Sequence, residues 1–211
     1  VRHLQSYDYT VRLSQQHYAL SLQPIVSREL SCGQPEADAS VELKRQYQSV
    51  LGALAYWMIT RIDLAVYAAT LQRAAHAPAV SHAKRLVLVR YVQRTPVDLV
   101  YRELQGFVGL LVISDSSFKR ETDTIHAMKG YLVVLHSSTT SGSSGQPVAN
   151  GNSLWNTESS QSTTQSSGSV MMLEYACKKQ KHVCRSTFAA ELFAAVDAID
   201  AALHIVTALF E

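Results

Sequence analysis

The feature that most constrains the fold of this 211-residue chain is a change in its apolar pattern near residue 107. Before that point, apolar side chains recur at spacings of three and four positions, most clearly at Leu43, Tyr47, Val50, Leu51 and Leu54. Such spacing predicts helices with one buried face over residues 42–106. In this region we expect Ser81 to cap a helix that ends near Arg94, because the residue before Pro96 is disfavoured in helical geometry.

After residue 107 the sequence is typical of strands and one long helix. Two apolar runs, Phe107–Ile113 and Tyr131–Leu135, have the length of strands, and Val170–Ala176 is a third candidate. The final segment, residues 187–211, is rich in Ala and Leu without Gly or Pro, which predicts a helix capped by Ser186 or Thr187. The predicted fold class is α/β (α+β), with a helical segment followed by an incomplete mixed sheet and one long C-terminal helix.

The remaining stretches connect these elements. Residues 1–30 contain a predicted strand, Tyr9–Leu13, and a helix that stops near Pro24, and the polar residues 31–41 are expected to be a linker. Residues 116–129 form a polar connection between the first two later strands. Residues 137–169 are mostly Ser, Thr, Gly, Gln and Asn, and bury too little apolar surface to offset the entropy of ordering them. We therefore expect a disordered loop there.

The charge balance does not by itself indicate a nucleic-acid-binding protein. Lys and Arg number 19 against 17 acidic residues, so any contact with phosphates must come from local patches. The densest basic cluster directly precedes the last helix and comprises Lys178, Lys179, Lys181, His182 and Arg185. A second cluster comprises His82, Lys84, Arg85, Arg90 and Arg94. Either cluster can bind phosphates, and either can equally be ordinary solvated surface.

Cysteine usage and hydropathy indicate the compartment. The three cysteines are odd in number and lack zinc-ligand spacing, which favours a reduced intracellular location, cytoplasmic or nuclear. No secretory signal is recognised near Val1, and the most apolar run that we identify, residues 50–59, is shorter than the ~20 residues that cross a bilayer. We expect no membrane partner. Because the chain does not begin with Met, we expect it to be a piece of a larger protein.

Two carboxylates are candidates for chemistry. Asp115 follows an apolar strand, where it is either a rigidly held ligand or a turn residue bonded to its own backbone. Glu191 lies in apolar surroundings in the first turns of the last helix, where it either serves a purpose or faces water near a favourable helix N-terminus. At about 100° per residue, Asp197 and Asp200 lie too far around the helix to join Glu191 at one metal, so we interpret both as a solvated face.

The order of several short motifs resembles the C-terminal half of copia-type retrotransposon polyproteins, in which the end of the reverse transcriptase leads into a ribonuclease H domain. The motifs that carry the resemblance follow the family's order along nearly the whole chain outside the Ser/Thr-rich loop. They are Tyr9–Gln15 with Tyr18, Tyr47–Tyr56, Thr60–Ala65, His82–Thr95, Ser114–Phe118, Gly130 with Tyr131, Lys178–Gln180, and Ser186–Leu192.

The resemblance implies a domain organisation and a site. Residues 1–106 would be the thumb or connection region of the reverse transcriptase, and residues 107–211 a partial ribonuclease H-like domain. Asp115 and Glu191 would be catalytic residues and ligands of Mg²⁺ in the complete enzyme. The partners would be an RNA–DNA hybrid or other nucleic acid and the remainder of the polyprotein, with the hybrid bound by Lys178, Lys179, Lys181 and Arg185.

The chain also departs from the family pattern. Ile62 stands where a proline is usual, Phe118 where a tryptophan is common, and the Ser/Thr-rich insertion is long. The adjacent aspartates of the polymerase site are absent from the sequence. Ribonuclease H enzymes hold two Mg²⁺ ions with four carboxylates, and the third lies on a strand for which no residues remain after Glu211.

Three functional interpretations therefore stay open. Two carboxylates cannot fix two metal ions ~4 Å apart, so we expect the isolated chain to be inactive. We also expect an unpaired sheet edge, with marginal stability or self-association. The leading hypothesis is a fragment of a reverse transcriptase and ribonuclease H polyprotein, whose ancestral activity is two-metal hydrolysis of RNA in RNA–DNA hybrids. The alternatives are a non-catalytic nucleic-acid-binding module and a decayed retroelement remnant.

Overall fold

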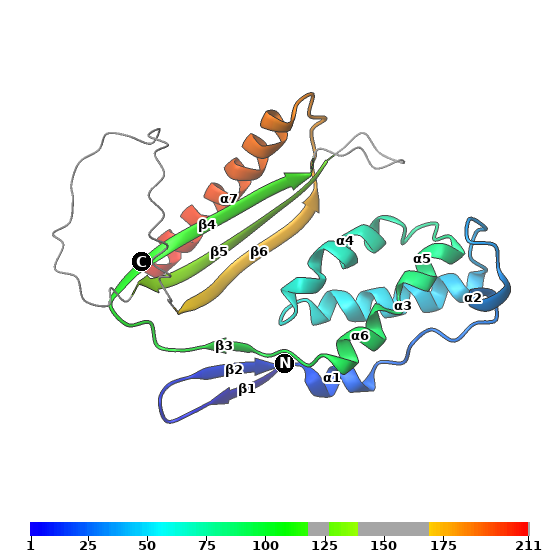
Figure 1. Cartoon of the computed structure of the whole chain (residues 1–211), viewed down its shortest axis with the longest axis horizontal. Coiled ribbons are helices and arrows are strands. Elements are labelled where there is room, and N and C mark those ends of the chain that lie inside the picture. Colours follow the sequence, from blue (N-terminus) through cyan, green and yellow to red (C-terminus); the bar gives the residue numbers. More distant parts are fainter. Residues whose placement is uncertain (118–126, 139–168, 211) are drawn as a thin grey trace, which may run out of the picture.

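The computed structural model describes residues 1–117, 127–138 and 169–210. Its N-terminal half is mainly helical with one small sheet, and its C-terminal half is a three-stranded sheet covered by one long helix (Figure 1). Both sheets are antiparallel. The predicted mixed fold class, α+β with a long C-terminal helix, is confirmed.

The helices of the N-terminal half pack around α3, as the apolar spacing predicts. Ser40 caps α3, since its Oγ accepts a hydrogen bond from the Leu43 N–H at 3.3 Å. The buried face of α3 includes Leu43, Tyr47, Leu51 and Leu54, and it forms the main core with residues of the other helices. The helices are α1 (Gln16–Ser21), α2 (Glu29–Cys32), α3 (Val41–Trp57), η1 (Ile62–Leu64), α4 (Ala65–Arg73), α5 (Val80–Arg85) and α6 (Leu88–Arg94).

Two details of this half differ from the sequence-based expectation. The single helix predicted from Ser81 to near Arg94 is two helices, α5 and α6, interrupted at Leu86 and Val87. The cap of α5 is not Ser81 but Ala79, whose N–H donates to the His82 Nδ1 at 3.0 Å. The predicted end near Arg94 is confirmed.

The N-terminal half also contains a small three-stranded sheet, of which the sequence predicted only one strand. It has the order β1 (Arg2–Gln5), β2 (Val11–Ser14) and β3 (Leu99–Tyr101). The strand expected at Tyr9–Leu13 begins later, at Val11, because Tyr9 lies in the β1–β2 turn with a φ of 60°, outside strand geometry. The expected linker, residues 31–41, begins at the end of α2, and Asp38 forms a β-bridge with Ala79.

The C-terminal sheet has the order β4 (Phe107–Ser117), β5 (Met128–Ser138) and β6 (Val170–Lys179). All three predicted strands are confirmed and are longer than expected. Asp115 therefore lies inside β4 and not beyond its end. The predicted bounds of the polar connection, residues 116–129, are wrong, because its first two residues belong to β4 and its last two belong to β5. Residues 118–126 lie outside the described part of the chain, as do residues 139–168 of the expected loop.

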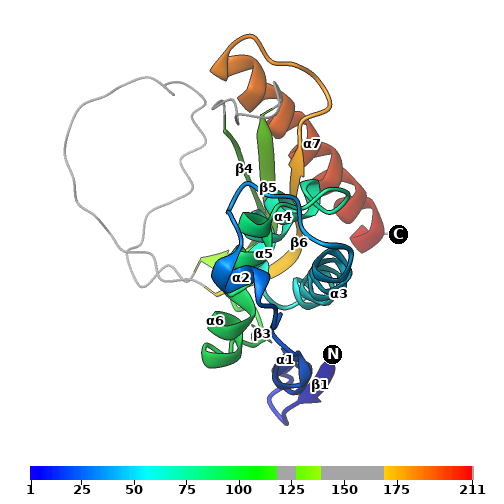
Figure 2. The same cartoon turned by 90° about the vertical axis from the view of Figure 1, so that its right-hand side faces the viewer.

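The last helix, α7 (Thr187–Phe210), crosses one face of this sheet (Figures 1 and 2). The predicted cap is confirmed, because the Ala189 N–H donates to the Ser186 Oγ at 3.1 Å. The face of α7 against the sheet is made of small side chains: Ala190, Ala194, Ala198, Ala201 and Ala202. Its outer face is exposed and apolar, with Phe188, Leu192, Val196, Ile199 and Leu203.

The sequence analysis overlooked that α7 is long and apolar enough to cross a membrane. Residues 187–209 meet both the length and the composition of such a helix. This is weak support for a membrane span, because a helix that covers a sheet with an apolar face has the same composition. The alanine side of α7 is packed on β4 and β5.

The two borders of the C-terminal sheet differ. The border formed by β6 is contacted by α4 and β3, and the Tyr175 hydroxyl donates to the Met58 carbonyl at 2.6 Å. The border formed by β4 is bare: within residues 1–117, 127–138 and 169–210, no strand pairs with β4 except β5. Its backbone groups on that side have no strand partner.

Tyr47 gives the helical core a sensitivity to alkaline pH. Its side chain is fully buried, its hydroxyl donates to the Leu71 carbonyl at 2.6 Å, and burial raises its pKa to about 12. An unfolded tyrosine ionises near pH ~10, so this stabilisation is complete below that pH and is lost as the pH rises toward the folded value. Urea unfolding at about pH 9 and about pH 11.5 measures how far the free energy of unfolding falls between these pH values. We expect this fall to be about 2 kcal/mol smaller in Tyr47→Phe than in the unchanged chain. Equal losses would contradict the expectation.

Candidate functional site

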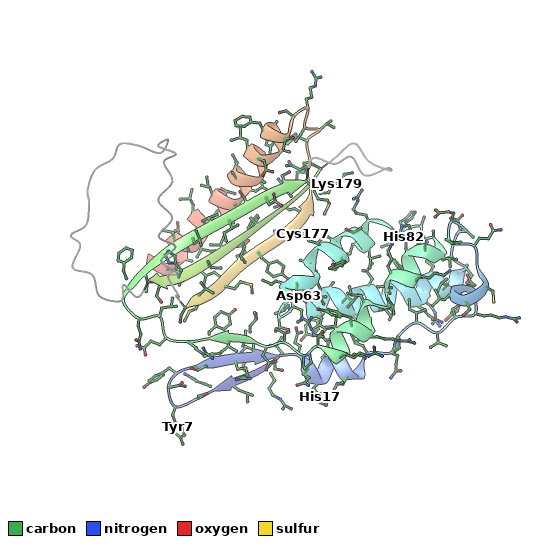
Figure 3. All side chains as sticks on the ribbon, in the orientation of Figure 1. Tyr7, His17, Asp63, His82, Cys177 and Lys179 are labelled. Carbon is green, nitrogen blue, oxygen red and sulfur yellow. The ribbon has the colours of Figure 1, made fainter. Side chains whose placement is uncertain are left out.

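Asp115 lies on the side of the C-terminal sheet that α7 does not cover. Neighbouring residues of a strand point to opposite faces, and along β4 the exposed positions alternate with more buried ones. Ser116 is only 7% exposed and belongs to the covered face, whereas Asp115 is exposed. The register places Asp115 beside Gly130 of β5, which is itself beside Cys177 of β6. Cys177 is labelled in Figure 3.

Glu191 lies on the flank of α7 that faces β4. Ala198 and Ala202 are in the buried stripe of the helix, and Glu191 falls between their directions when each residue turns the helix by about 100°. The other flank of the helix faces β5 and β6, because Asp197 binds Lys129 and Lys178 there. Glu191 is half-buried. The position of Glu191 on the helix is therefore on the β4 side.

Gln180 connects the strand that carries Asp115 with the helix that carries Glu191. Its side chain is 1% exposed, and its Nε2 donates to the Ala190 carbonyl at 2.8 Å and to the Ser116 Oγ at 3.4 Å. Its backbone N–H donates to the Ala127 carbonyl at 2.8 Å. Gln180 therefore joins the immediate neighbours of both candidate carboxylates. The sequence analysis noted Gln180 only as part of a motif.

Asp115 and Glu191 belong to opposite faces of the C-terminal sheet, since Asp115 lies on the uncovered face and Glu191 lies on the helix that packs against the other face. In the part of the chain that the structure describes, neither Asp115 nor Glu191 makes a hydrogen bond or an ion pair. Both carboxylates are therefore uncommitted. No group of three or more His, Cys, Asp or Glu side chains with the arrangement of a metal site occurs among the described residues.

Asp197 is not part of a solvated face, so that interpretation was wrong. One carboxylate oxygen of Asp197, Oδ2, accepts from Lys129 Nζ at 2.6 Å and from Lys178 Nζ at 3.0 Å. The hydrogen bond from Lys129, followed by that from Lys178, lowers the pKa of Asp197 below its usual value. Lys129 is only 8% exposed, so Asp197 neutralises a nearly buried charge on the sheet. Asp200, by contrast, is 75% exposed, as expected.

The residues of the basic cluster before α7 differ in whether they form an ion pair. Lys178 is committed to Asp197 and lies 5.6 Å from the centre of the Tyr131 ring. The other three candidates for binding nucleic acid are exposed, and none has an ion pair within the described residues: Lys179, Lys181 and Arg185. Lys179 lies at the end of β6, level with Ser117 at the end of β4 (Figure 3). The exposed cations thus share one end of the sheet with Asp115.

We expect Gln180→Leu to lower the free energy of unfolding by about 1 kcal/mol. The change removes the hydrogen bonds to Ala190 and Ser116, and it also removes the Gln180 Oε1, which is buried without a hydrogen-bond partner in the described residues. The second effect offsets part of the first. Urea unfolding of this variant beside Gln16→Leu, a change at an exposed glutamine, measures the difference. An unchanged midpoint in Gln180→Leu would show that the connection is not stabilising.

Comparison of the chain with family models, with curated proteins and with solved structures finds no match.

Proposed function

We propose that this chain is a piece of a copia-type reverse transcriptase and ribonuclease H polyprotein, whose ancestral activity is two-metal hydrolysis of RNA in RNA–DNA hybrids. The observation that carries the proposal is the connection through Gln180 between the neighbours of Asp115 and Glu191. The order of elements supports it: three antiparallel strands, of which the first bears Asp115, and then a helix across the sheet that bears Glu191.

The donor set at the border of β4 fits Mg²⁺ only in part. Mg²⁺ prefers carboxylate oxygens together with water, and Asp115 and Glu191 supply two uncommitted carboxylates, but they lie on a strand and on a helix that covers the opposite face of the sheet. Bound metal ions would supply an activated water and stabilise the leaving oxygen. Asp115 and Glu191 would hold the ion, while Gln180 would hold the strand and the helix together. Two ions need more ligands than these two side chains, so we expect no cleavage by the chain alone.

Paramagnetic Mn²⁺, used in place of Mg²⁺, tests the proposed ligands directly. We expect Mn²⁺ to broaden the amide NMR signals of residues 114–116 and 190–192 first, because Asp115 and Glu191 lie in these segments. Asp115→Asn should remove the broadening from both segments, while Asp200→Asn, at an exposed aspartate of the same helix, should leave it unchanged. Broadening that is confined to one segment, or that survives Asp115→Asn, would exclude a shared site.

Cleavage of a labelled RNA–DNA hybrid distinguishes the remaining outcomes. With Mg²⁺ we expect no product above the rate without protein. Mg²⁺-dependent cleavage that disappears in Asp115→Asn would show that the chain is a complete nuclease. Cleavage that persists in Asp115→Asn would come from a contaminant.

One observation favours a non-catalytic nucleic-acid-binding module as the second candidate. Lys179, Lys181 and Arg185 are exposed and have no ion pairs in the described part of the chain. If they bind an RNA–DNA hybrid, affinity should fall steeply with salt, and the triple alanine variant should reduce that dependence. Hybrid binding without Mn²⁺ broadening would favour this candidate, and the absence of both would favour the decayed remnant.

A further inference from the structure

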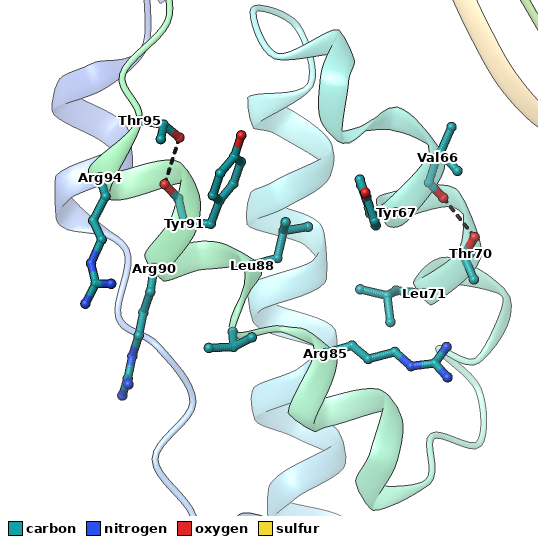
Figure 4. A pocket seen from close by; sticks show the side chains of 11 residues that line it. Val66, Tyr67, Thr70, Leu71, Arg85, Leu88, Arg90, Tyr91, Arg94 and Thr95 are labelled. Carbon is teal, nitrogen blue, oxygen red and sulfur yellow. Dashed lines mark hydrogen bonds between the residues drawn. The ribbon is translucent and has the colours of Figure 1, made fainter.

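The helical half contains a groove that the proposed nuclease site does not use. It has a volume of about 910 Å³ and lies between α4 on one side and α5 and α6 on the other (Figure 4). Leu71, which is 3% exposed, and the half-buried Leu88 form its apolar floor. Tyr67 of α4 and Tyr91 of α6 stand on opposite sides of this floor (Figure 4).

The two tyrosines are exposed although each is large and aromatic. Tyr67 is 59% exposed and Tyr91 is 53% exposed. Two such rings beside one groove form an exposed aromatic surface. Their flat faces are available to a ligand that has flat apolar groups of its own.

The Tyr91 ring packs beside a buried and hydrogen-bonded arginine. The guanidinium of Arg61 lies 6.0 Å from the centre of the Tyr91 ring and is itself 2% exposed. Arg61 is fixed by paired hydrogen bonds to Asp63 at 2.8 and 2.7 Å and by a third to the Thr95 carbonyl at 2.6 Å. The hydroxyl of Thr95 also donates to the Tyr91 carbonyl at 2.8 Å. The ring of Tyr91 is thus positioned before any ligand binds.

The charge around the groove is positive and uncompensated. Arg85, Arg90 and Arg94 line it, and none of its lining residues is acidic. All three are exposed, and none has an ion pair within the described residues, whereas Arg12, Arg45 and Arg61 each have one. Arg90 and Arg94 lie on the same side of α6, four residues apart, and Arg85 lies at the far end of the groove (Figure 4). The groove therefore matches a ligand with several negative charges.

We propose that this groove binds a single strand of nucleic acid, with bases stacked on Tyr67 and Tyr91 and phosphates on Arg85, Arg90 and Arg94. A single strand combines the two features that the groove complements, since its bases are flat and unpaired and its phosphates recur along the backbone. The paired bases of a duplex are stacked on one another and cannot reach the tyrosine rings. This site does not depend on Asp115, Glu191 or a metal ion.

Fluorescence anisotropy with a labelled single-stranded DNA, and with duplex DNA and RNA–DNA hybrid of the same sequence, tests the proposal. We expect the single strand to bind at least about tenfold more tightly than either duplex. Tyr91→Ala should weaken single-strand binding by about tenfold, because one stacked base is lost. Tyr7→Ala, at a fully exposed tyrosine of the β1–β2 turn (Figure 3), should leave it unchanged.

Paired arginine variants test the phosphate contacts. Arg90→Ala with Arg94→Ala should weaken binding at least about tenfold and make the salt dependence shallower by about 1.4 logarithmic units per decade, as expected for two phosphates of a single strand. The matched control is Arg2→Ala with Arg28→Ala, which removes the same charge at exposed positions outside the groove. If the alanine pair does not fold, Arg90→Gln with Arg94→Gln gives the same test.

The outcomes separate this proposal from the nuclease proposal. Equal binding of single strand and duplex, or equal effects of the groove and control variants, would overturn the groove. Asp115→Asn should leave single-strand binding unchanged, and Tyr91→Ala should leave the Mn²⁺ broadening near residues 115 and 191 unchanged. Each proposal can therefore fail while the other stands.

Discussion

Replacing Asp197 by asparagine is expected to lower the free energy of unfolding by about 3 kcal/mol. The loss comes from Lys129, whose side chain is 8% exposed and lies 2.6 Å from the Asp197 carboxylate. Without that carboxylate, a nearly buried ammonium group loses its counter-charge, and its desolvation is no longer offset. Lys178 adds to the cost, because its ammonium group binds the same oxygen at 3.0 Å.

Urea unfolding near neutral pH measures this effect, and two further variants identify its cause. Asp200→Asn removes a carboxylate from the exposed side of the same helix and should leave the midpoint unchanged. Lys129→Met together with Asp197→Asn should recover most of the lost stability, because the buried charge is removed as well. A double variant as unstable as Asp197→Asn alone would show that packing, rather than charge, causes the loss.

The same ion pair predicts a response to acid. The hydrogen bond from Lys129 lowers the pKa of Asp197, so the folded state holds this proton less tightly than the unfolded chain does. The stabilisation is therefore complete above the unfolded pKa of ~3.9 and is lost as the pH falls through the lower folded value. The Asp197→Asn variant should lack this part of the acid dependence.

Asp63→Ala is expected to cost about 3 kcal/mol for a related reason. Asp63 is 47% exposed, but its partner Arg61 is 2% exposed and donates two of its three hydrogen bonds within the described residues to this carboxylate. Removal of Asp63 leaves the buried guanidinium, among the described residues, with the Thr95 carbonyl as its one remaining acceptor and the Tyr91 ring beside it. The cost arises at Arg61, although the substitution is made at the more exposed partner.

A thermodynamic cycle tests the origin of this second loss. Arg61→Met combined with Asp63→Ala should be less destabilising than Asp63→Ala alone, because no buried charge remains. Glu42→Ala is the control, since it breaks a carboxylate–arginine pair in which both side chains are exposed, and it should not change the unfolding midpoint. If Glu42→Ala and Asp63→Ala behave alike, burial of Arg61 is not the cause.

The sequence was informative where apolar periodicity decides the structure. Helix α3 buries the predicted positions Leu43, Tyr47, Leu51 and Leu54, and the three strands of the C-terminal sheet contain the predicted apolar runs. It was less informative where no local signal exists. The interruption between α5 and α6 at Leu86 contains neither Gly nor Pro, and every residue of β1 is exposed, so neither has a distinctive pattern.

The candidate site illustrates the same limit. Strand length decides which face a residue occupies, and the extension of β4 through Ser117 places Asp115 on the uncovered face of the sheet. The partners of Asp197 come from β5 and β6, far away in sequence, so helical geometry alone suggested a solvated position. Gln180 likewise acquires its role only through tertiary contacts with Ser116 and Ala190.

The difference between the two borders of the C-terminal sheet limits how copies of this chain can aggregate. A fibre grows only if each molecule offers two adhesive edges, so that every addition recreates an acceptor. Among the described residues, the C-terminal sheet offers one such edge at β4, while α4 and β3 contact the other at β6, and the small sheet offers a further unpaired edge at β1. Pairing of β4 with β4 of a second copy across a twofold axis therefore gives a closed dimer, whereas pairing of β4 with β1 of the next copy leaves one edge free at each end and can continue.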